Sequence, residues 1–263
     1  MSLYLNHPVL TDISSVPLLY VITPTFTRPT QLPDLTRLAN TLRLVPRLHW
    51  LVAEDQTNTS ASVAELLVAA GVSYTHLAAA RPPEMEGKQI GRGVFNRRAA
   101  LEWVREQGEE SGVIYFADDD NAYDVRIFEE IRNTVRVSVF PVGGINGYGV
   151  SSPIVQNGTI TGFFDAFQGG REFAMDMAGF AVSVSLFKSR PEATMPIELY
   201  YLEEGFLKSL GVSKAELEPR ANLCTKVWVW HTRTETAPVV KLKDIAGLEE
   251  SNLPQLYSEL NAE

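Results

Sequence analysis

Short, uninterrupted apolar runs alternate with amphipathic segments over roughly the first 120 residues of the chain. One such run, at residues 18–22, predicts a strand buried on both faces, and strand-like segments follow at 48–53, 72–77 and 113–117. Between them, apolar residues at helical spacing predict helices at residues 35–42, 66–70 and 94–107. This alternation is typical of a doubly wound, mostly parallel α/β sheet, which binds ligands at the carboxyl ends of its strands.

A short motif predicts where the second helix begins and ends. Ser62 and Glu65 have the spacing of a capping box, in which each side chain accepts a hydrogen bond from the backbone of the other residue. Gly71 follows the last apolar residue and would end the helix in a left-handed conformation.

The pattern changes near residue 141, where glycines become frequent. Asn157 and Gly158 lie between two β-rich runs, as the turn of a β-hairpin would. Later runs predict strands near residues 177–185 and 226–230 and a helix near 203–210. The sequence has no Ser/Pro-rich linker and no internal repeat, so we expect two lobes that share one core.

The charge balance restricts the partners of the chain. Lys and Arg number 23 against 32 Asp and Glu, and the net charge of −9 repels nucleic acid and anionic membranes unless basic residues cluster. A ligand that bears phosphate therefore needs a local basic pocket or a metal ion. The single cysteine, Cys224, allows neither an internal disulfide nor a cysteine-based zinc site. Without a signal-peptide pattern or a long apolar run, we expect a soluble chain, with membrane attachment only through an anchor outside it.

Three consecutive carboxylates, Asp118, Asp119 and Asp120, follow the fourth predicted strand directly. Adjacent carboxylates repel one another, and a hard divalent cation with oxygen ligands would compensate them while bridging a diphosphate. The alternative is a solvated turn that caps a helix beginning near Asp124. The pattern alone leaves both interpretations open.

Polar residues also follow the first two predicted strands, at 23–28 and at Glu54 and Asp55, so three loops would meet in one crevice. Loop polarity by itself is ordinary. Arg92 and Arg97 are cations in an acidic chain, and their spacing suits recognition of a phosphate or a carboxylate. The alternative for this pair is a solvated helix face.

Two further pairs of residues are candidates for chemistry. His231 and Arg233 lie just past an apolar strand, although a lone histidine is more often structural than catalytic. Glu203 and Glu204 begin a predicted helix, where carboxylates usually complement the helix dipole. A general base must lie beside a reacting hydroxyl, and spacing cannot show this.

Several segments resemble one known family, the animal β1,3-glucuronyltransferases, which are inverting enzymes of the GT-A fold. The matching segments occur in family order at residues 20–25 (YVITPT), 42–52 (LRLVPRLHWLV), 115–121 (YFADDDN), 176–182 (DMAGFAV), 217–222 (LEPRAN) and 229–235 (VWHTRTE). Matches of this length are far more specific than three aspartates in a row. The resemblance implies an α/β fold with a doubly wound, mostly parallel sheet and a mixed, acceptor-binding C-terminal half.

The resemblance also implies a site for UDP-glucuronic acid. Asp120 would bind Mn²⁺ together with the diphosphate, and Asp118 and Asp119 would contact the donor sugar and the ribose. The remaining implied donor contacts are Pro24, Thr25 and Asp55 around the uridine, and Arg92, Arg97, His231 and Arg233 around the diphosphate and the sugar carboxylate.

A galactose-terminated glycan is the acceptor that the resemblance implies. Arg171, Asp176 and Phe167 would hold the acceptor sugar, and Glu203 would be the catalytic base, with Glu204 as its neighbour. The implied reaction inverts the α-linked donor into a β1,3-linked product.

Organisation and location are implied in the same way. Residues 1–17 would be an extension, 18–140 the nucleotide-sugar-binding half, 141–236 the acceptor-binding and catalytic half, and 237–263 a tail in contact with a second copy. Family members are Golgi type II membrane proteins and homodimers, so the chain would be the luminal catalytic part of such a protein. The sequons at Asn58 and Asn157 would then be available for glycosylation.

The chain departs from the family at two acceptor positions. Val150 and Ser151 stand where relatives carry an aromatic residue and a glutamate, and Phe167 stands where a tryptophan is usual. Two alternative functions therefore stay open. The donor could be another UDP-sugar such as UDP-xylose, or the chain could be a catalytically silent nucleotide-sugar-binding protein.

Overall fold

A seven-stranded sheet organises the computed structural model, which describes residues 15–235 and 250–259. Its strand order is β11-β6-β10-β4-β1-β2-β3. The strands span Leu19–Thr25 (β1), Leu48–Glu54 (β2), Ser73–Ala78 (β3), Val113–Phe116 (β4), Val137–Val139 (β6), Phe180–Ser183 (β10) and Leu217–Pro219 (β11). Strands β3, β2, β1 and β4 are parallel neighbours, whereas β10 runs antiparallel to both β4 and β6. The predicted doubly wound, mostly parallel sheet is confirmed.

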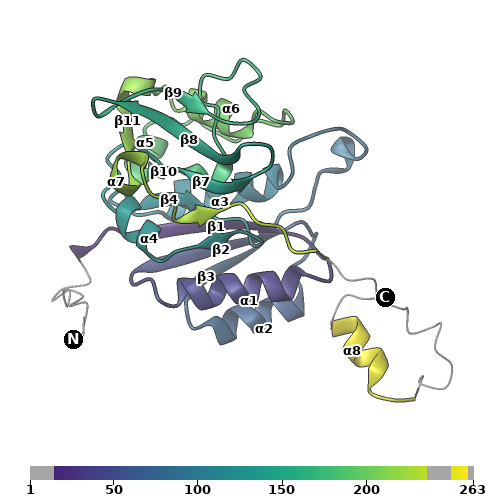
Figure 1. Cartoon of the computed structure of the whole chain (residues 1–263). Coiled ribbons are helices and arrows are strands. Elements are labelled where there is room, and N and C mark those ends of the chain that lie inside the picture. The colour runs from purple at the N-terminus through teal and green to yellow at the C-terminus, as the bar shows by residue number, and fades with distance from the viewer. Residues whose placement is uncertain (1–14, 236–249, 260–263) are drawn as a thin grey trace.

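Helices cover both faces of this sheet. The helices are Gln31–Leu42 (α1), Ala61–Ala70 (α2), Val94–Gln107 (α3), Arg126–Ile131 (α4), Val184–Lys188 (α5), Leu202–Ser209 (α6), Ala221–Cys224 (α7) and Leu253–Glu259 (α8). Alternate residues of β1 point to opposite faces, so Leu19 and Val21 pack with α1 and α2, while Tyr20 and Ile22 pack with α3. Figure 1 shows α1 and α2 together beneath β1, β2 and β3.

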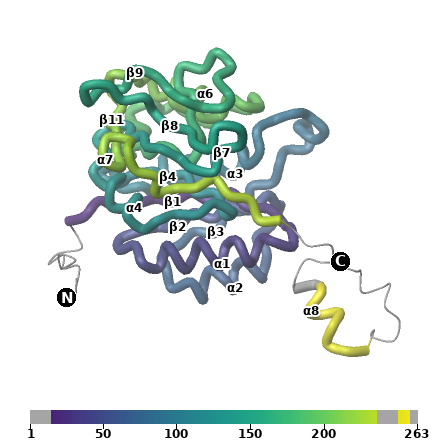
Figure 2. The backbone as a smooth tube through the Cα atoms, viewed as in Figure 1, coloured from purple at the N-terminus to yellow at the C-terminus, as the bar shows by residue number. Residues whose placement is uncertain are grey.

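A smaller five-stranded sheet, of order β5-β12-β7-β8-β9, covers the other side of the molecule. Its strands span Ala122–Tyr123 (β5), Val142–Ile145 (β7), Gly149–Gln156 (β8), Thr159–Phe164 (β9) and Val229–Trp230 (β12). The predicted hairpin turn joins β8 to β9, and both turn residues have positive φ, 52° at Asn157 and 77° at Gly158. Figure 2 shows the late segment that contains β12 crossing the middle of the molecule.

The carboxyl ends of β1, β2 and β4 meet at one edge of the large sheet. Parallel register brings Thr25 beside Glu54, and the Asp55 N–H donates to the Thr25 carbonyl at 2.9 Å. The Ala117 N–H likewise donates to the Ile22 carbonyl at 2.9 Å. The loops that follow these strands therefore begin side by side, as the sequence predicted.

Three local predictions need correction. Residues 177–185 form a short 3₁₀ turn, Met177–Gly179, then β10 and the start of α5, and the strand expected at 226–230 is only β12. The capping box at Ser62 and Glu65 is also wrong, because the N-cap of α2 is Ser60. The confirmed end of α2 is Gly71, with φ of 67°.

The buried carboxylate at the end of β2 explains the earlier start of α2. Glu54 is fully buried and needs donors, which Ser60 supplies through its N–H at 2.8 Å and its hydroxyl at 2.9 Å. Ser60 Oγ in turn accepts from the Val63 N–H at 3.4 Å. Sequence spacing cannot reveal this demand, because Glu54 lies on a different element.

No helix in the described parts of the chain is long and apolar enough to cross a membrane.

The position of the cap gives a direct stability test. Ser60→Ala should lower the free energy of unfolding by about 2 kcal/mol, because it removes the cap and a hydrogen bond to a buried carboxylate. Ser62→Ala is the matched control and should change it by less than about 0.5 kcal/mol. Urea denaturation measures both variants, and equal losses would contradict the assignment of the N-cap to Ser60.

Candidate active site

The loop after β4, residues 118–120 and called the acidic loop below, is hydrogen-bonded to the end of β1 and to the loop that follows it. Asp119 is buried and accepts hydrogen bonds from Thr25 Oγ1 and Arg28 Nη2, each at 2.7 Å. Arg28 also binds Asp34 of α1 at 2.9 Å. Burial raises the pKa of Asp119 to about 6, although Arg28 and Thr25 oppose the shift. Sequence reasoning missed Arg28, whose one signal was a cation three residues beyond a strand end in an acidic chain.

Arg97 compensates the first of the three carboxylates. Its Nη2 lies 2.5 Å from Asp118 Oδ1, and its Nη1 donates to the Arg92 carbonyl at 2.9 Å. A Cβ on Gly93, where φ is 66°, would lie 2.7 Å from Arg97 Nη1 and 2.9 Å from Pro24 Cβ. Glycine at this position therefore lets the start of α3 approach the β1 loop and place Arg97 in the crevice.

Asp120 differs from its two neighbours. Within the described residues no side chain donates to its carboxylate, while Thr232 Oγ1 donates to its backbone carbonyl. Burial raises the pKa of Asp120, and the charge of Asp118 raises it further. An unpaired carboxylate among like charges fits a hard divalent cation, which would relieve the repulsion.

A metal at Asp120 would need ligands from outside the protein. The part of the chain that the structure describes has no group of three or more His, Cys, Asp or Glu side chains placed to hold a metal ion. Cations such as Mg²⁺ are often bound by one or two carboxylates together with substrate phosphates and water. The chemistry of this donor set therefore fits a cation shared with a diphosphate.

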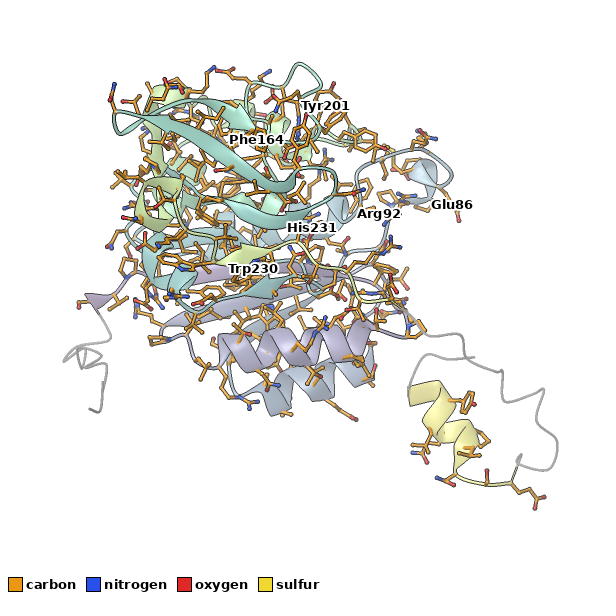
Figure 3. All side chains as sticks on the ribbon, viewed as in Figure 1. Glu86, Arg92, Phe164, Tyr201, Trp230 and His231 are labelled. Atoms are coloured by element: carbon orange, nitrogen blue, oxygen red, sulfur yellow. The ribbon has the colours of Figure 1, made fainter. Side chains whose placement is uncertain are left out.

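His231, at the end of β12, pairs with Asp176 across the site. Its Nδ1 lies 3.3 Å from Asp176 Oδ2, and this hydrogen bond raises the pKa of His231 to about 9. The charges of Asp118 and Asp120 raise the pKa further. The imidazole is half-exposed and carries a positive charge at neutral pH. Figure 3 shows His231 beneath Phe164 and Tyr201.

The two adjacent glutamates of α6 have different surroundings. Glu204 accepts hydrogen bonds from the Glu172 and Phe173 N–H groups at 3.1 and 2.7 Å, and Lys208 lies 2.5 Å from it. Burial alone would raise the pKa of Glu204, but these donors lower it. The contacts of Glu204 are thus structural.

Glu203 receives no hydrogen bond from the backbone of residues 172 and 173 or from Lys208, although a hydrogen bond from its own backbone lowers its pKa. Its side chain is 17% exposed, and its ion pair among the described residues is a long one, 3.7 Å to Arg171 Nη1. Burial raises the pKa of Glu203 to about 7, and Asp176 adds to the shift while Arg171 and Arg97 oppose it. A carboxyl group with this pKa can accept or release a proton near neutral pH.

Arg171 and Phe167 lie beside Glu203, with Arg171 Nη1 3.7 Å from its carboxylate. Arg171 is buried, pairs with Asp165 at 3.1 Å and lies over the Phe167 ring at 4.9 Å from its centroid. Phe167 is half-exposed. Ser151 on β8 is 1% exposed, and its hydroxyl has no partner in the described part of the chain.

Three of the expected donor residues make no side-chain contact with the three aspartates in the described part of the chain. Asp55 is exposed and accepts from the Arg81 N–H at 2.8 Å, and the Arg92 side chain is exposed. Arg233 lines a cavity of about 420 Å³ together with Arg37 and Asn121. No described contact joins Asp55 or Arg233 to the acidic loop's side chains.

The fold resembles that of solved glycosyltransferase structures. Comparison with solved structures finds S. aureus TarS 1–349 in complex with UDP-GlcNAc, with a TM-score of 0.50 at 15% identity, covering 84% of this chain and 60% of that chain. This likeness concerns the fold alone, which is the GT-A type of the glycosyltransferases.

The family model described as glycosyltransferase family 43 matches residues 38–235, and the chain belongs to this family. It is 44% identical over 252 residues to galactosylgalactosylxylosylprotein 3-beta-glucuronosyltransferase S of Drosophila melanogaster, covering 95% of this chain and 62% of that protein. Enzyme P of the same organism is 46% identical, with 88% and 49% covered, and human enzyme 2 is 44% identical, with 88% and 73% covered. The chain thus spans about half to two-thirds of the length of the two fly relatives.

The contrast between the two glutamates predicts opposite effects on stability at pH 8. The folded-state pKa of Glu203, about 7, lies above its ordinary value of 4.5, so the folded state binds more protons between these values and loses stability as pH rises through them. Glu203→Gln removes this loss and should raise the free energy of unfolding at pH 8 by up to about 3 kcal/mol, with little change at pH 4.

Glu204→Gln is the matched variant, and it should lower stability at pH 8 by about 1 kcal/mol because it weakens the hydrogen bonds to two backbone N–H groups. Denaturant titration at both pH values distinguishes the two. A loss of stability at pH 8 in both variants would contradict the isolated position of Glu203.

Proposed function

We propose that the protein transfers glucuronic acid from UDP-glucuronic acid to a terminal galactose, with inversion, to form a β1,3 linkage in a Mn²⁺-dependent reaction. The buried carboxyl of Glu203 carries the proposal, since burial raises its pKa to about 7 and its nearest charged partner is Arg171 at 3.7 Å. The names of the relatives, which are 3-beta-glucuronosyltransferases, support the donor and the linkage.

The donor would bind at the carboxyl ends of β1, β2 and β4. In a chain of net charge −9, Arg97 and the cationic His231 supply the local positive charge that a diphosphate needs. The planar fork of Arg97 also suits the sugar carboxylate. The further donor contacts in this proposal are Pro24, Thr25, Asp55, Arg92, Asp118, Asp119 and Arg233.

Asp120 would hold Mn²⁺, because its carboxylate has no side-chain donor among the described residues and lies beside two like charges. When bound, the ion adds positive charge to the diphosphate leaving group. The charge of Asp120 also acts on His231. The pairing of His231 with Asp176 keeps the imidazole protonated and positively charged at neutral pH.

Glu203 would accept the proton of the acceptor hydroxyl as the oxygen attacks the anomeric carbon of the donor. Arg171, Asp176 and Phe167 would hold the acceptor. Arg97 and His231 stabilise the negative charge that develops on the departing UDP. A single displacement from the face opposite the leaving group inverts the anomeric configuration.

The proposed donor half (18–140) and acceptor half (141–236) share both sheets. Strands β10 and β11 of the second half complete the large sheet, and β5 of the first half pairs with β12 in the small sheet. We therefore propose the two halves as functional regions of one folding unit. The extension at 1–17 and the tail at 237–263 fall mostly outside the described residues. A Golgi location and a homodimer are further proposals that rest on the family resemblance.

A UDP-release assay tests the reaction. With Mn²⁺ and a galactose-terminated acceptor, we expect UDP release from UDP-glucuronic acid and much less from UDP-xylose. Glu203→Gln should lower turnover by about 10²–10⁴-fold while UDP affinity stays near normal, because the variant loses only the proton acceptor. Wild-type turnover should fall as pH drops below about 7, since protonated Glu203 cannot act as a base.

Other outcomes would replace this function. Release from UDP-xylose alone would change the donor. No release from any UDP-sugar, with UDP binding intact, would favour a silent nucleotide-sugar-binding protein. Glu204→Gln is the control, and a greater loss of turnover in that variant would move the base by one residue.

Calorimetry of UDP binding tests the metal. We expect Mn²⁺ to strengthen UDP binding at least about tenfold over the chelated protein, because Asp120 would hold the cation, whose charge would attract the diphosphate. Asp120→Asn should bind UDP in Mn²⁺ as weakly as the chelated wild type does. Equal affinity with Mn²⁺ and with chelator would contradict the metal assignment.

A further inference from the structure

Five exposed aromatic side chains occur on the acceptor side of the molecule. Their exposed fractions are 55% for Tyr148, 44% for Phe164, 40% for Phe167, 62% for Tyr200 and 38% for Tyr201. They come from the β7–β8 turn, the end of β9, the loop after β9 and the segment before α6. Figure 3 shows Phe164 and Tyr201 in the same upper part of the view, above His231. Exposed aromatic side chains that lie close together often mark a binding surface, whereas scattered single ones do not.

Ring contacts organise these side chains into two groups. Tyr148 stacks on Phe164 with centroids 4.8 Å apart and planes at 21°. Phe167 contacts Tyr200 at 5.2 Å and Tyr201 at 6.2 Å. Neither group belongs to the buried core, so packing does not account for their positions.

The two groups are neighbours in space. A Cβ on Gly147 would lie 3.8 Å from the Ala166 side chain, so the turn that carries Tyr148 packs against the loop that carries Phe167. The Tyr201 hydroxyl donates to the Gly169 carbonyl at 3.0 Å and holds the other end of the same loop. The aromatic surface is therefore continuous across this loop.

The surface begins at the proposed base. Arg171 lies over the Phe167 ring and 3.7 Å from Glu203, so the Phe167 group borders the place where the acceptor hydroxyl would react. The Tyr148–Phe164 pair lies across the loop from that group, on the β7–β8 turn and the last residue of β9. An acceptor longer than one sugar would reach it.

We propose that Tyr148 and Phe164 form a second acceptor subsite, which holds a sugar ring of the acceptor glycan on the reducing side of the terminal galactose. This inference rests on the proposed function. The C–H groups on one face of a sugar carry partial positive charge and pack on the negative face of an aromatic ring. The Tyr148 hydroxyl has no partner among the described residues, and it can exchange hydrogen bonds with sugar hydroxyls.

A sugar fits this pair better than a membrane or a protein. The net charge of −9 disfavours an anionic lipid surface. A specific protein interface buries about 800 Å² on each partner, which is far more than two half-exposed rings provide. One or two sugar rings match the size of the pair.

Kinetics with acceptors of increasing length test this subsite separately from the reacting centre. The probes are methyl β-galactoside, galactosyl-galactose and galactosylgalactosylxylose. In the Tyr148→Ala/Phe164→Ala variant, kcat/KM should fall about tenfold for the longest acceptor through a higher KM, with kcat unchanged. Methyl β-galactoside should be used as well as by the wild type. Both rings are half-exposed, so the variant should keep the wild-type Tm.

Ile154→Ala is the matched control, because Ile154 is equally exposed on the neighbouring strand β8 but belongs to neither aromatic group. This control should leave kcat/KM unchanged for all three acceptors. Equal losses on the monosaccharide and the trisaccharide, or no loss on either oligosaccharide, would overturn the subsite.

A measurement of acceptor binding that needs no turnover tests this inference independently of the proposed function. Saturation-transfer NMR on the wild type should show contact between the protein and the inner sugars of galactosylgalactosylxylose, and the double variant should lose that contact. This result in a protein that transfers no sugar would keep the subsite and remove the proposed activity. Inner-sugar contact that survives in the double variant would overturn the subsite even in an active enzyme.

Discussion

Compensation of three adjacent carboxylates is the constraint on which the rest of the site depends. Asp118 is paired with Arg97, Asp119 with Thr25 and Arg28, and Asp120 keeps a carboxylate without a side-chain donor in the described residues. Each pairing joins a different element to the end of β4. Electrostatic demand at one loop therefore fixes where the β1 loop and the start of α3 must lie.

The same physical rule separates the two glutamates of α6. Burial favours the neutral form of both carboxyls. Within the described residues, Glu204 has donors from residues 172, 173 and 208, whereas Glu203 has only a distant arginine and a hydrogen bond from its own backbone. These donors lower the pKa of Glu204, while burial raises the pKa of Glu203 to about 7. Adjacent carboxyls of one helix therefore differ because neighbouring helical residues face different surroundings.

Asp176 acts on two residues that come from different parts of the chain. It pairs with His231, which follows β12, and its charge also raises the pKa of Glu203 on α6. The sheets join the same two parts of the chain on a larger scale. Strand β10 pairs with β4, and β12 pairs with β5. Residues 18–140 and 141–235 therefore share both sheets.

The sequence by itself determined the strands and helices of roughly the first 120 residues, apart from the start of α2, and the meeting of the strand ends at the acidic loop. Periodicity and strand-end polarity are local properties, so α3 was predicted at its observed bounds and the turn at Asn157 was found. The tertiary structure alone decided that Arg28 holds Asp119, that Ser60 caps α2, and that the backbone of residues 172 and 173 donates to Glu204 rather than to Glu203. Each of these depends on a partner distant in the sequence or on burial, and neither quantity is written in the spacing of nearby residues.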